Sequence, residues 1–317
     1  MSPKLVTVVG ATGAQGGGIV DLLLKDPNYS VRAITRNPQS ETAKALAAKG
    51  AEVVAADADS VPSLIAAFQG SHAIFAVTNF FEPFMRFDLN PDKAVETEVL
   101  QGINLAKAAS ATPTLEHYIW STLPSSKKIS GGKYSVPHFE GKVKIDEHIK
   151  SDKALHAKTT FLWVTFYASN LDFPMYRPYF IPTGQTYIQL QSTPADTPIF
   201  SIGDVRKNLP LVFKAVIEQP EKTRGQYVVA YSEKTNSGEF LQTWASENGH
   251  KAVYVQVSRD TFNSVWPGWS EELGVMMEFW DEYRDLSWSG EEGLLTPKDL
   301  GVTGFSSVKE GVKGLKY

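Results

Sequence analysis

The stretch VTVVGATGAQGG, residues 6–17, decides how this chain folds. An apolar run ends at Gly10, and further glycines follow at Gly13 and Gly16, where an amphipathic segment begins. Gly10 can adopt the backbone angles that a tight turn needs, and Gly13 has no Cβ to keep a ligand away from the backbone. Gly16 lets a helix pack close to the strand, and the helix N-terminus offers free N–H groups to a phosphate. The pattern predicts a strand, a turn and a helix that together hold a pyrophosphate.

The first half of the chain alternates between short apolar segments and segments with helical spacing. We expect strands at residues 5–9, 31–35, 52–56, 73–77, 115–120 and 160–165. We expect helices at residues 16–25, 41–49, 62–68, 95–109 and 139–150. Apolar strands separated by helices form parallel sheets that are covered on both faces. Because such crossovers are right-handed, the prediction is an α/β fold with a doubly wound parallel sheet, a Rossmann domain.

This regular alternation stops after residue 167. Residues 173–184 are rich in proline and aromatic side chains, 209–220 have helical spacing, and 225–233 are typical of a strand. We therefore predict a dinucleotide-binding Rossmann domain at 1–166. Residues 167–317 are predicted to form a smaller C-terminal α+β region that caps the carboxyl edge of the sheet and is interleaved with the first domain.

Composition excludes several classes of function. The 317 residues are 42% hydrophobic, and the net charge of −4 argues against a nucleic-acid partner. The chain has no cysteine, and its 6 histidines are scattered, so we expect no metal site and no thiol chemistry. No apolar stretch approaches the roughly 20 residues that span a bilayer, so we expect no membrane association. The expected compartment is the cytoplasm, with entry into the nucleus left open.

The end of the second predicted strand bears on which dinucleotide is bound. A cofactor with a free 2′-hydroxyl usually meets Asp or Glu there. The sequence VRAITRNP, residues 31–38, offers Thr35 and Arg36 and no carboxylate. A guanidinium presents several donors to phosphate oxygens. The residue type therefore favours NADP(H) over NAD(H), and an ordinary surface arginine is the alternative.

The helix after the fifth predicted strand carries candidate catalytic residues. Short-chain dehydrogenases place Tyr and Lys four residues apart on one helix face, but none of the 12 tyrosines here precedes a lysine at that spacing. Instead, VPHFEGKVKIDEHIK, residues 136–150, places His138 and Lys142 at this spacing. Lys142 is predicted to hold the nicotinamide ribose, with a solvated helix lysine as the alternative. His138 is a candidate proton donor, and a packing role at the helix entry is equally open.

Three loops at the carboxyl ends of strands complete the predicted site, because such loops often contact ligands. Thr78, Asn79 and Phe80 follow the fourth strand and are expected to line the nicotinamide ribose and ring. Ser121 follows the fifth strand, where a hydroxyl often assists hydride transfer. Asp57 ends the third strand and is expected either at the adenine or as a helix N-cap.

Taken together, VTVVGATGAQGGGIVDLLL, VRAITRNP, VTNFFE, VPHFEGKVKIDEHIK and FYASNLDF resemble the NmrA-like family, within the atypical short-chain dehydrogenase/reductase superfamily. The resemblance covers most of the first 170 residues. It implies a Rossmann domain with a small C-terminal domain and NAD(P) in the cleft between them. It also implies that Arg36 meets the 2′-phosphate, that Lys142 is the superfamily lysine, and that the pyrophosphate is cradled by Gly10, Thr12, Gly13, Ala14, Gln15 and Gly16. Tyr167 and Asn170 match the family segment after the sixth strand, and His138 departs from the tyrosine of classical reductases.

Two main hypotheses of function follow. The first is an NADPH-dependent reductase of a bulky, largely apolar metabolite with a C=O, C=N or C=C acceptor, as in the isoflavone-reductase-like relatives that act on secondary metabolites. An aromatic or polycyclic substrate would be lined by aromatic side chains, for which the candidates are Phe80, Phe81, Phe84, Tyr176, Tyr179 and Trp266. The second is a non-catalytic NADP(H)-sensing regulator that binds a protein partner, as in other family members. A cofactor-retaining isomerase or cyclase is a further alternative.

Overall fold

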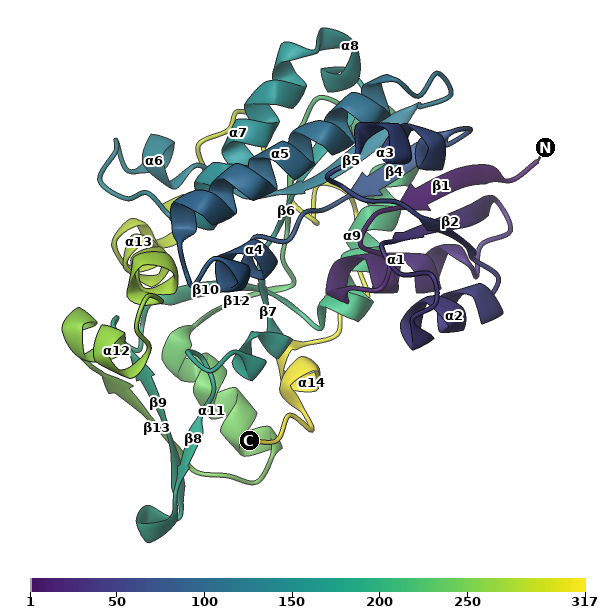
Figure 1. The fold of residues 1–317 in the computed structure, drawn as a ribbon. Coiled ribbons are helices and arrows are strands. Elements are labelled where there is room, and N and C mark those ends of the chain that lie inside the picture. The colour runs from purple at the N-terminus through teal and green to yellow at the C-terminus, as the bar shows by residue number, and fades with distance from the viewer. Residues whose placement is uncertain (1) are drawn as a thin grey trace.

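A seven-stranded parallel sheet forms the centre of the protein, whose residues 2–317 are described by a computed structural model (Figure 1). The strand order is β11-β6-β5-β4-β1-β2-β3. The bounds are Lys4–Val8 (β1), Tyr29–Thr35 (β2), Glu52–Ala55 (β3), Ala73–Ala76 (β4), His117–Thr122 (β5), Thr159–Val164 (β6) and Tyr227–Ala230 (β11). Because β1 lies between β2 and β4, the strand order reverses there, which is where doubly wound sheets bind ligands. The predicted fold class is confirmed.

Helices cover both faces of this sheet. One face carries α3 (Val61–Phe68), α5 (Pro91–Ser110) and α7 (Pro137–Ser151), which form one apolar core with the sheet. The other face carries α1 (Ala14–Leu23), α2 (Glu41–Ala48) and α9 (Val205–Glu218), which form a second core. The short helices on this half are α4 (Phe81–Arg86), α6 (Ser126–Ile129), α8 (Lys153–His156) and α10 (Pro220–Thr223).

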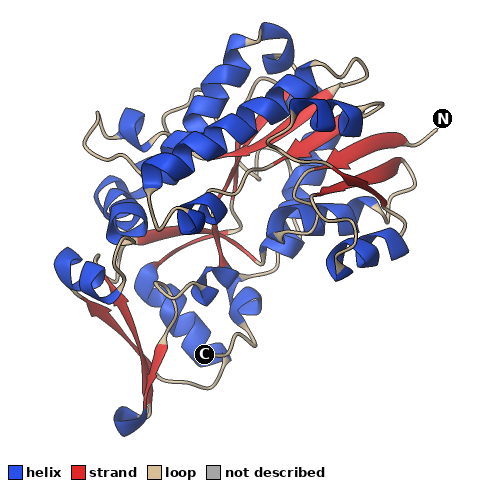
Figure 2. Cartoon of the chain, viewed as in Figure 1, coloured by secondary structure: helices blue, strands red, loops and turns tan. Residues whose placement is uncertain are grey.

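The second half of the chain contributes both to the large sheet and to two small sheets (Figure 2). Strand β11 pairs in parallel with β6, and α9 packs against α1, so the two halves are interleaved. One three-stranded sheet has the order β12-β10-β7, with bounds Glu233–Asn236, Pro198–Gly203 and Phe166–Tyr167. The other has the order β13-β9-β8, with bounds Ala252–Gln256, Thr186–Gln191 and Tyr179–Ile181. The remaining helices are α11 (Ser237–Glu247), α12 (Arg259–Val265), α13 (Val275–Tyr283) and α14 (Val308–Val312).

Two local differences from the sequence-based prediction affect the site. Strand β5 ends at Thr122, because Ser121 and Thr122 pair with Leu162 and Trp163 of β6. Ser121 therefore lies within the strand and not in the loop after it. The second difference is α4, which was not predicted and begins directly after the loop that carries Thr78.

The glycines of the opening motif have two structural roles. A Cβ at Gly16 would lie 2.5 Å from the carbonyl oxygen of Gly10, so this glycine allows the turn to close on the helix. A Cβ at Gly18 would lie 2.3 Å from the carbonyl oxygen of Arg206, at the start of α9. At Gly17 the nearest atom is the far end of the Arg206 side chain, which can move. The consecutive glycines thus serve the close contact between α1 and α9 as well as the turn.

Within residues 2–317, no helix is both long and apolar enough to cross a membrane.

Candidate functional site

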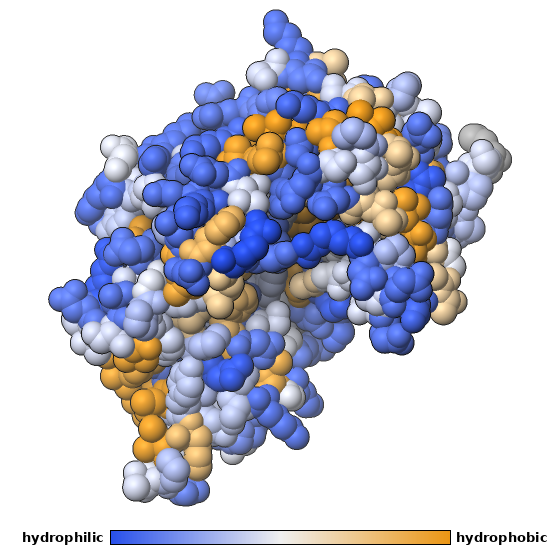
Figure 3. Space-filling view, viewed as in Figure 1, coloured by the Kyte–Doolittle hydropathy of each residue, from blue (hydrophilic) through white to orange (hydrophobic). Residues whose placement is uncertain are grey.

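A cavity of about 720 Å³ lies at the carboxyl edge of the large sheet. One wall consists of residues at the ends of the strands, from the glycine turn after β1 to Thr165 after β6. The opposite wall comes from the second half of the chain and includes Met276 and Trp280 of α13. Figure 3 shows the hollow between these two walls, with hydrophilic side chains across its mouth.

The glycine turn forms one end of the cavity, which is lined by Gly10, Thr12, Gly13, Ala14, Gln15 and Gly16. Gly10 has a φ of +68°, a left-handed conformation that favours glycine. Gly13 is the N-cap residue of α1, and no side chain caps this helix. The first N–H groups of α1 are therefore free for an anion. This backbone cradle fits the diphosphate of a dinucleotide.

Gln15 and Tyr167 meet beside this cradle. Gln15 Nε2 donates a hydrogen bond of 2.6 Å to the hydroxyl of Tyr167, while Gln15 Oε1 is buried without a partner. Burial raises the pKa of Tyr167 to about 12, so its phenol is neutral at physiological pH. Asn170 lines the same part of the cavity. The unpaired oxygen of Gln15 leaves one polar group available to a ligand.

Arg36 lines the far end of the cavity, but its guanidinium is paired with Glu82. Its Nη1 and Nη2 donate to the two carboxylate oxygens of Glu82 at 2.5 and 2.9 Å. This pair connects the loop after β2 with α4, and both side chains are largely exposed. Asp57 lines the same end, and its carboxylate accepts the N–H of Asp59 at 3.0 Å. A phosphate at Arg36 has to displace Glu82 or share the guanidinium with it.

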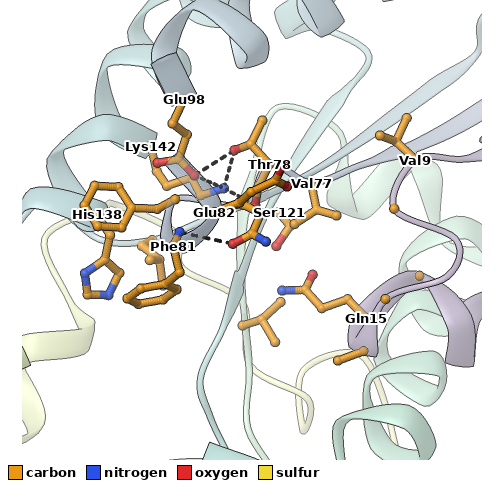
Figure 4. Close-up of a pocket in the computed structure, with 18 of the residues that line it drawn as sticks. Val9, Gln15, Val77, Thr78, Phe81, Glu82, Glu98, Ser121, His138 and Lys142 are labelled. Carbon is orange, nitrogen blue, oxygen red and sulfur yellow. Dashed lines mark hydrogen bonds and ion pairs between the residues drawn. The ribbon is translucent and has the colours of Figure 1, made fainter. Parts of the chain in front are cut away.

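Lys142 lies on α7, where this helix faces the carboxyl ends of the strands (Figure 4). Its Nζ donates to the carbonyl oxygen and the hydroxyl of Thr78 at 3.1 and 2.5 Å, and it lies 3.0 Å from Oε1 of Glu98. The Thr78 hydroxyl in turn donates to the same oxygen of Glu98 at 2.9 Å. Lys142 is therefore a buried, paired cation at the cavity wall and not a solvated helix lysine.

Glu98 is a fully buried carboxylate on α5. Its Oε2 has no hydrogen-bond partner among the described residues. A Cβ at residue 141 would lie 2.9 Å from this oxygen, so Gly141 allows α7 to approach Glu98. A buried charge needs a partner, and Lys142 supplies it.

His138 lies one helical turn before Lys142 at the start of α7. Its Nδ1 is hydrogen-bonded to Oε1 of Glu272, which is fully buried. The rings of Phe80, Phe81 and Phe139 surround the imidazole, with centroids 5.8, 5.5 and 4.7 Å from it. His138 also lines the cavity.

The remaining loop residues of the predicted site also reach the cavity, as Thr78, Asn79, Phe80 and Ser121 all line it. The side chain of Asn79 accepts the N–H of Phe81 at 3.1 Å, which shapes the turn into α4. Ser121 is nearly buried, and no hydrogen bond of its hydroxyl is found within residues 2–317.

Aromatic and apolar side chains enclose the part of the cavity beyond His138. Phe81 and Phe173 face each other with centroids 5.6 Å apart. The other lining side chains of this aromatic compartment are Phe139, Phe166, Tyr176, Leu273, Met276, Trp280 and Trp288. Burial raises the pKa of Tyr176, and its hydroxyl has no partner in residues 2–317.

Three aromatic residues predicted for this lining lie outside the cavity. Phe84 is buried behind it, where it packs against Phe80 and Trp269 at centroid distances of 5.3 and 5.2 Å. Trp266, at the C-terminal end of α12, packs against Phe262 at 4.9 Å and against Tyr179 at 6.4 Å and does not line the cavity. Phe84, Tyr179 and Trp266 are therefore corrected from lining residues to supporting or peripheral ones.

A second buried acid lies under the site, one turn after Lys142. Asp146 accepts hydrogen bonds from Trp120 Nε1, Thr122 Oγ1 and the Tyr227 hydroxyl at 2.8, 2.7 and 2.9 Å. Burial raises its pKa to about 7, although these three bonds lower it. The network ties α7 to β5 and to β11, and so fixes the helix that carries Lys142.

Comparison with known proteins identifies the chain. Residues 2–299 match the NmrA-like family. The chain belongs to the NmrA-like family. A relative named NmrA-like family domain-containing oxidoreductase from Aspergillus campestris is 30% identical over 280 residues, covering 84% of this chain and 79% of the relative. Another so named, from Aspergillus hancockii, is 28% identical over 271 residues, covering 82% and 78%.

Solved structures share the NmrA-like fold over almost the whole chain. NmrA, a negative transcriptional regulator, in complex with NAD superposes with a TM-score of 0.78 at 19% identity, covering 99% of this chain and 96% of that one. The triphenylmethane reductase of Citrobacter sp. complexed with NADP(H) has a TM-score of 0.65 at 18% identity, with coverage of 97% and 98%.

Several functional residues of this NmrA-like site were missed from the sequence. Glu272, which bonds to His138, and the lining residues Trp280 and Trp288 lie more than a hundred residues from His138, and no local pattern indicates that they reach the site. Glu98 had an indirect signal, the mid-helix Gly141 directly before Lys142. For Glu82 there was no signal in the sequence, because a glutamate at a helix start is usually a solvated residue. Within residues 2–317, no cluster of three or more acidic or histidine side chains can hold a metal ion.

Proposed function

We propose that this protein is an NADPH-dependent reductase of a bulky, largely apolar small molecule with a C=O, C=N or C=C acceptor. The observation that carries the proposal is that one cavity joins the glycine cradle to an aromatic compartment, with Lys142 between them. A cradle alone would suffice for a binding protein. The compartment supplies room and apolar surface for a second ligand beside the reactive end of the dinucleotide.

The names of similar proteins, and the cofactors bound in their solved structures, support this proposal. The Aspergillus relatives are named oxidoreductases. Among the structures of the same fold, a quinone oxidoreductase of Escherichia coli is complexed with NADPH, and the triphenylmethane reductase is complexed with NADP(H). One of these reductases is named for quinones and the other for triphenylmethane, both of which are ring compounds, and this agrees in kind with the aromatic lining of this cavity.

Each residue of the site has a defined task in the proposed reaction. Bound NADPH supplies a hydride from the nicotinamide C4. The N-terminus of α1 binds the diphosphate, and Arg36 binds the 2′-phosphate once it leaves Glu82. Lys142, held by Thr78 and Glu98, donates to the ribose hydroxyls and places positive charge where negative charge develops.

The aromatic compartment positions the substrate. Phe81, Phe173 and Trp280 all line it and provide flat apolar surfaces for a ring system. The unpaired hydroxyl of Ser121 is available to a polar atom of the substrate. Because these groups also keep water away, hydride transfer is favoured over side reactions.

Calorimetry and single-turnover kinetics test the proposal. Purified protein is titrated with NADPH, NADP⁺ and NADH, and the NADPH complex is then mixed with a panel of aromatic ketones, imines and quinones that includes 9,10-phenanthrenequinone. We expect NADPH to bind more tightly than NADH, and at least one probe to oxidise bound NADPH. Binding without oxidation by any probe, together with unequal affinity for NADP⁺ and NADPH, would instead support a redox-sensing regulator with a protein partner.

A further inference from the structure

The site lacks the tyrosine that classical short-chain reductases use, yet two residues are placed to do its work. We propose that His138 is the proton donor of the reaction, that Glu272 is the residue that positions and charges its ring, and that the acceptor is a carbonyl group. This inference rests on the proposed reductase function and narrows its substrate class. The inference adds Glu272, which lies in the second half of the chain, to a site formed mainly by residues of the first half.

The two nitrogens of His138 have different surroundings. Nδ1 is bonded to Oε1 of Glu272, a fully buried residue that does not line the cavity. Nε2 forms no hydrogen bond within residues 2–317. Nε2 is also absent from the buried polar atoms that lack a partner, and His138 lines the cavity. Since Nδ1 is held, Nε2 is the nitrogen that can exchange a proton with a ligand.

His138 and Lys142 share one face of α7. Residues four apart on a helix lie about 5–6 Å apart at Cβ, so a ligand at the cavity wall reaches both. Lys142 is fixed by Thr78 and Glu98. The imidazole therefore stands beside the predicted ribose-binding lysine, at the spacing where a proton donor is required.

Glu272 is suited to support an imidazolium. It is fully buried, and its bond to His138 is the one hydrogen bond that its carboxylate makes in residues 2–317, since Oε2 has no partner. A buried carboxylate without compensation is costly, so a proton shared with His138 offsets the loss of hydration. A buried acid on Nδ1 also selects the tautomer of the neutral ring, as in acid–histidine pairs of hydrolases.

The backbone at Glu272 has an unusual form. Residues Ser270–Gly274 make a π-helical turn directly before α13. Turns of this kind are rare, and they occur frequently at functional sites because they redirect a side chain from the helix. The rings of Phe80, Phe81 and Phe139 pack around the imidazole of this pair.

A hydride adds to the carbonyl carbon, the C=O π bond breaks, and its electron pair moves to oxygen. That oxygen takes the proton from Nε2 of His138, which leaves a neutral ring with its proton on Nδ1 toward Glu272. The carbonyl compound is reduced to an alcohol, NADPH is oxidised to NADP⁺, and a proton from water restores His138.

Nitrogen NMR of the side chains tests the geometry without turnover. The chain has only 6 histidines, so a ¹⁵N-labelled sample gives a simple spectrum, and the His138 signals are those lost in His138→Gln. In the intact protein at high pH, we expect the neutral ring of His138 to carry its proton on Nδ1. In Glu272→Gln the proton should move largely to Nε2. A neutral ring protonated on Nε2 in the intact protein would overturn the inference without any need for the Glu272 variant to fold.

Kinetics with NADPH and phenanthrenequinone supply the second readout. Removal of a general acid typically costs about 10²–10⁴-fold, so we expect kcat to fall at least ~100-fold in His138→Gln. Glu272→Gln should lower kcat roughly tenfold or more with KM nearly unchanged, and the double variant should be no worse than His138→Gln. Glu271→Gln is the matched control, because Glu271 lies on the same turn but is exposed and pairs with Arg259.

The outcomes separate the two proposals. If the intact protein reduces the quinone and Glu272→Gln retains both its kcat and the Nδ1 tautomer, the role of Glu272 is refuted while the reductase function stands. If the intact protein binds no NADPH, the proposed function itself fails, whatever the tautomer of His138.

Discussion

The ammonium of Lys142 lies 3.0 Å from Oε1 of Glu98, and the hydroxyl of Thr78 bonds to both groups. Glu98 has no exposed surface, so its charge is stabilised almost entirely by this contact. The cation that is predicted to hold the ribose is therefore also part of a buried ion pair between α5 and α7. Function and stability are coupled at this position, which leads to the first prediction.

Lys142→Met should destabilise the protein by roughly 3–5 kcal/mol, because it leaves Glu98 buried and unpaired. The double variant Lys142→Met/Glu98→Gln should recover a large part of that loss, because no charge is then left without a partner. Urea unfolding of the two single variants and the double variant measures the coupling energy. If the single losses simply add, the two charges do not depend on one another.

Glu82 is expected to compete with the 2′-phosphate of NADP⁺ for Arg36, because it occupies both donors of the guanidinium. Glu82→Gln should therefore raise the affinity for NADP⁺ several-fold and change the affinity for NAD⁺ little. Arg36→Met should lower NADP⁺ affinity about 10–100-fold, the range for loss of hydrogen bonds to a charged group. Calorimetric titration of each variant with both dinucleotides checks this. Equal changes for the two cofactors would place the 2′-phosphate elsewhere.

Two neighbouring glycines of α1 should respond oppositely to alanine. At Gly18 the new Cβ would lie 2.3 Å from the backbone of Arg206, so α1 and α9 must separate, and we expect a loss of at least about 1–3 kcal/mol. At Gly17 only the mobile end of the Arg206 side chain has to move. There the gain in helix propensity, roughly 0.5–1 kcal/mol, should dominate. Thermal unfolding of Gly18→Ala and Gly17→Ala tests this matched pair, and a similar loss in both would refute the argument.

Asp146 should make stability depend on pH. Its pKa is raised in the folded protein from 3.8 to about 7 by burial, so the folded state binds more protons than the unfolded state between these values. Its contribution is fully present below pH 3.8 and is lost as the pH rises through about 7. The unfolding free energy should fall by up to about 1.4 kcal/mol per pH unit in this window.

Asp146→Asn is the test of that dependence. Asparagine keeps an acceptor for Trp120 and Thr122 and a donor toward Tyr227, and so resembles the protonated acid. Urea unfolding at several pH values between 5 and 8 should show a flatter profile for the variant. An unchanged slope would assign the pH dependence to other groups.

Local patterns predicted most of the large sheet and which residues gather at its carboxyl edge. The glycine turn, Arg36, Thr78 and Lys142 all line one cavity, because the carboxyl ends of parallel strands meet at one edge. The family resemblance is confirmed over residues 2–299. These inferences needed only the spacing of residues that are close in the chain.

The substrate half could not be predicted in the same way. Phe84 and Trp266 have the expected chemistry, but the unpredicted helix α4 and the packing against Phe262 place them outside the cavity. Glu272 and Trp280 reach the site through packing of the second half on the first, which sequence spacing does not encode. Aromatic content indicated an apolar pocket, while tertiary contacts decided which rings form it.

Strand β11 follows its neighbour β6 by more than sixty residues in the sequence, which affects the order in which the sheet can form. During synthesis, β6 is complete long before Tyr227–Ala230 leaves the ribosome, and until then it is an unpaired outer strand. The side chains of Phe161 and Trp163 on β6 also lack a packing partner until Tyr227 is made. In the folded protein the Tyr227 ring packs against them at centroid distances of 4.6 and 5.2 Å. An open apolar edge of this kind is prone to aggregation, so we expect the incomplete sheet to be most vulnerable before its last strand has been synthesised.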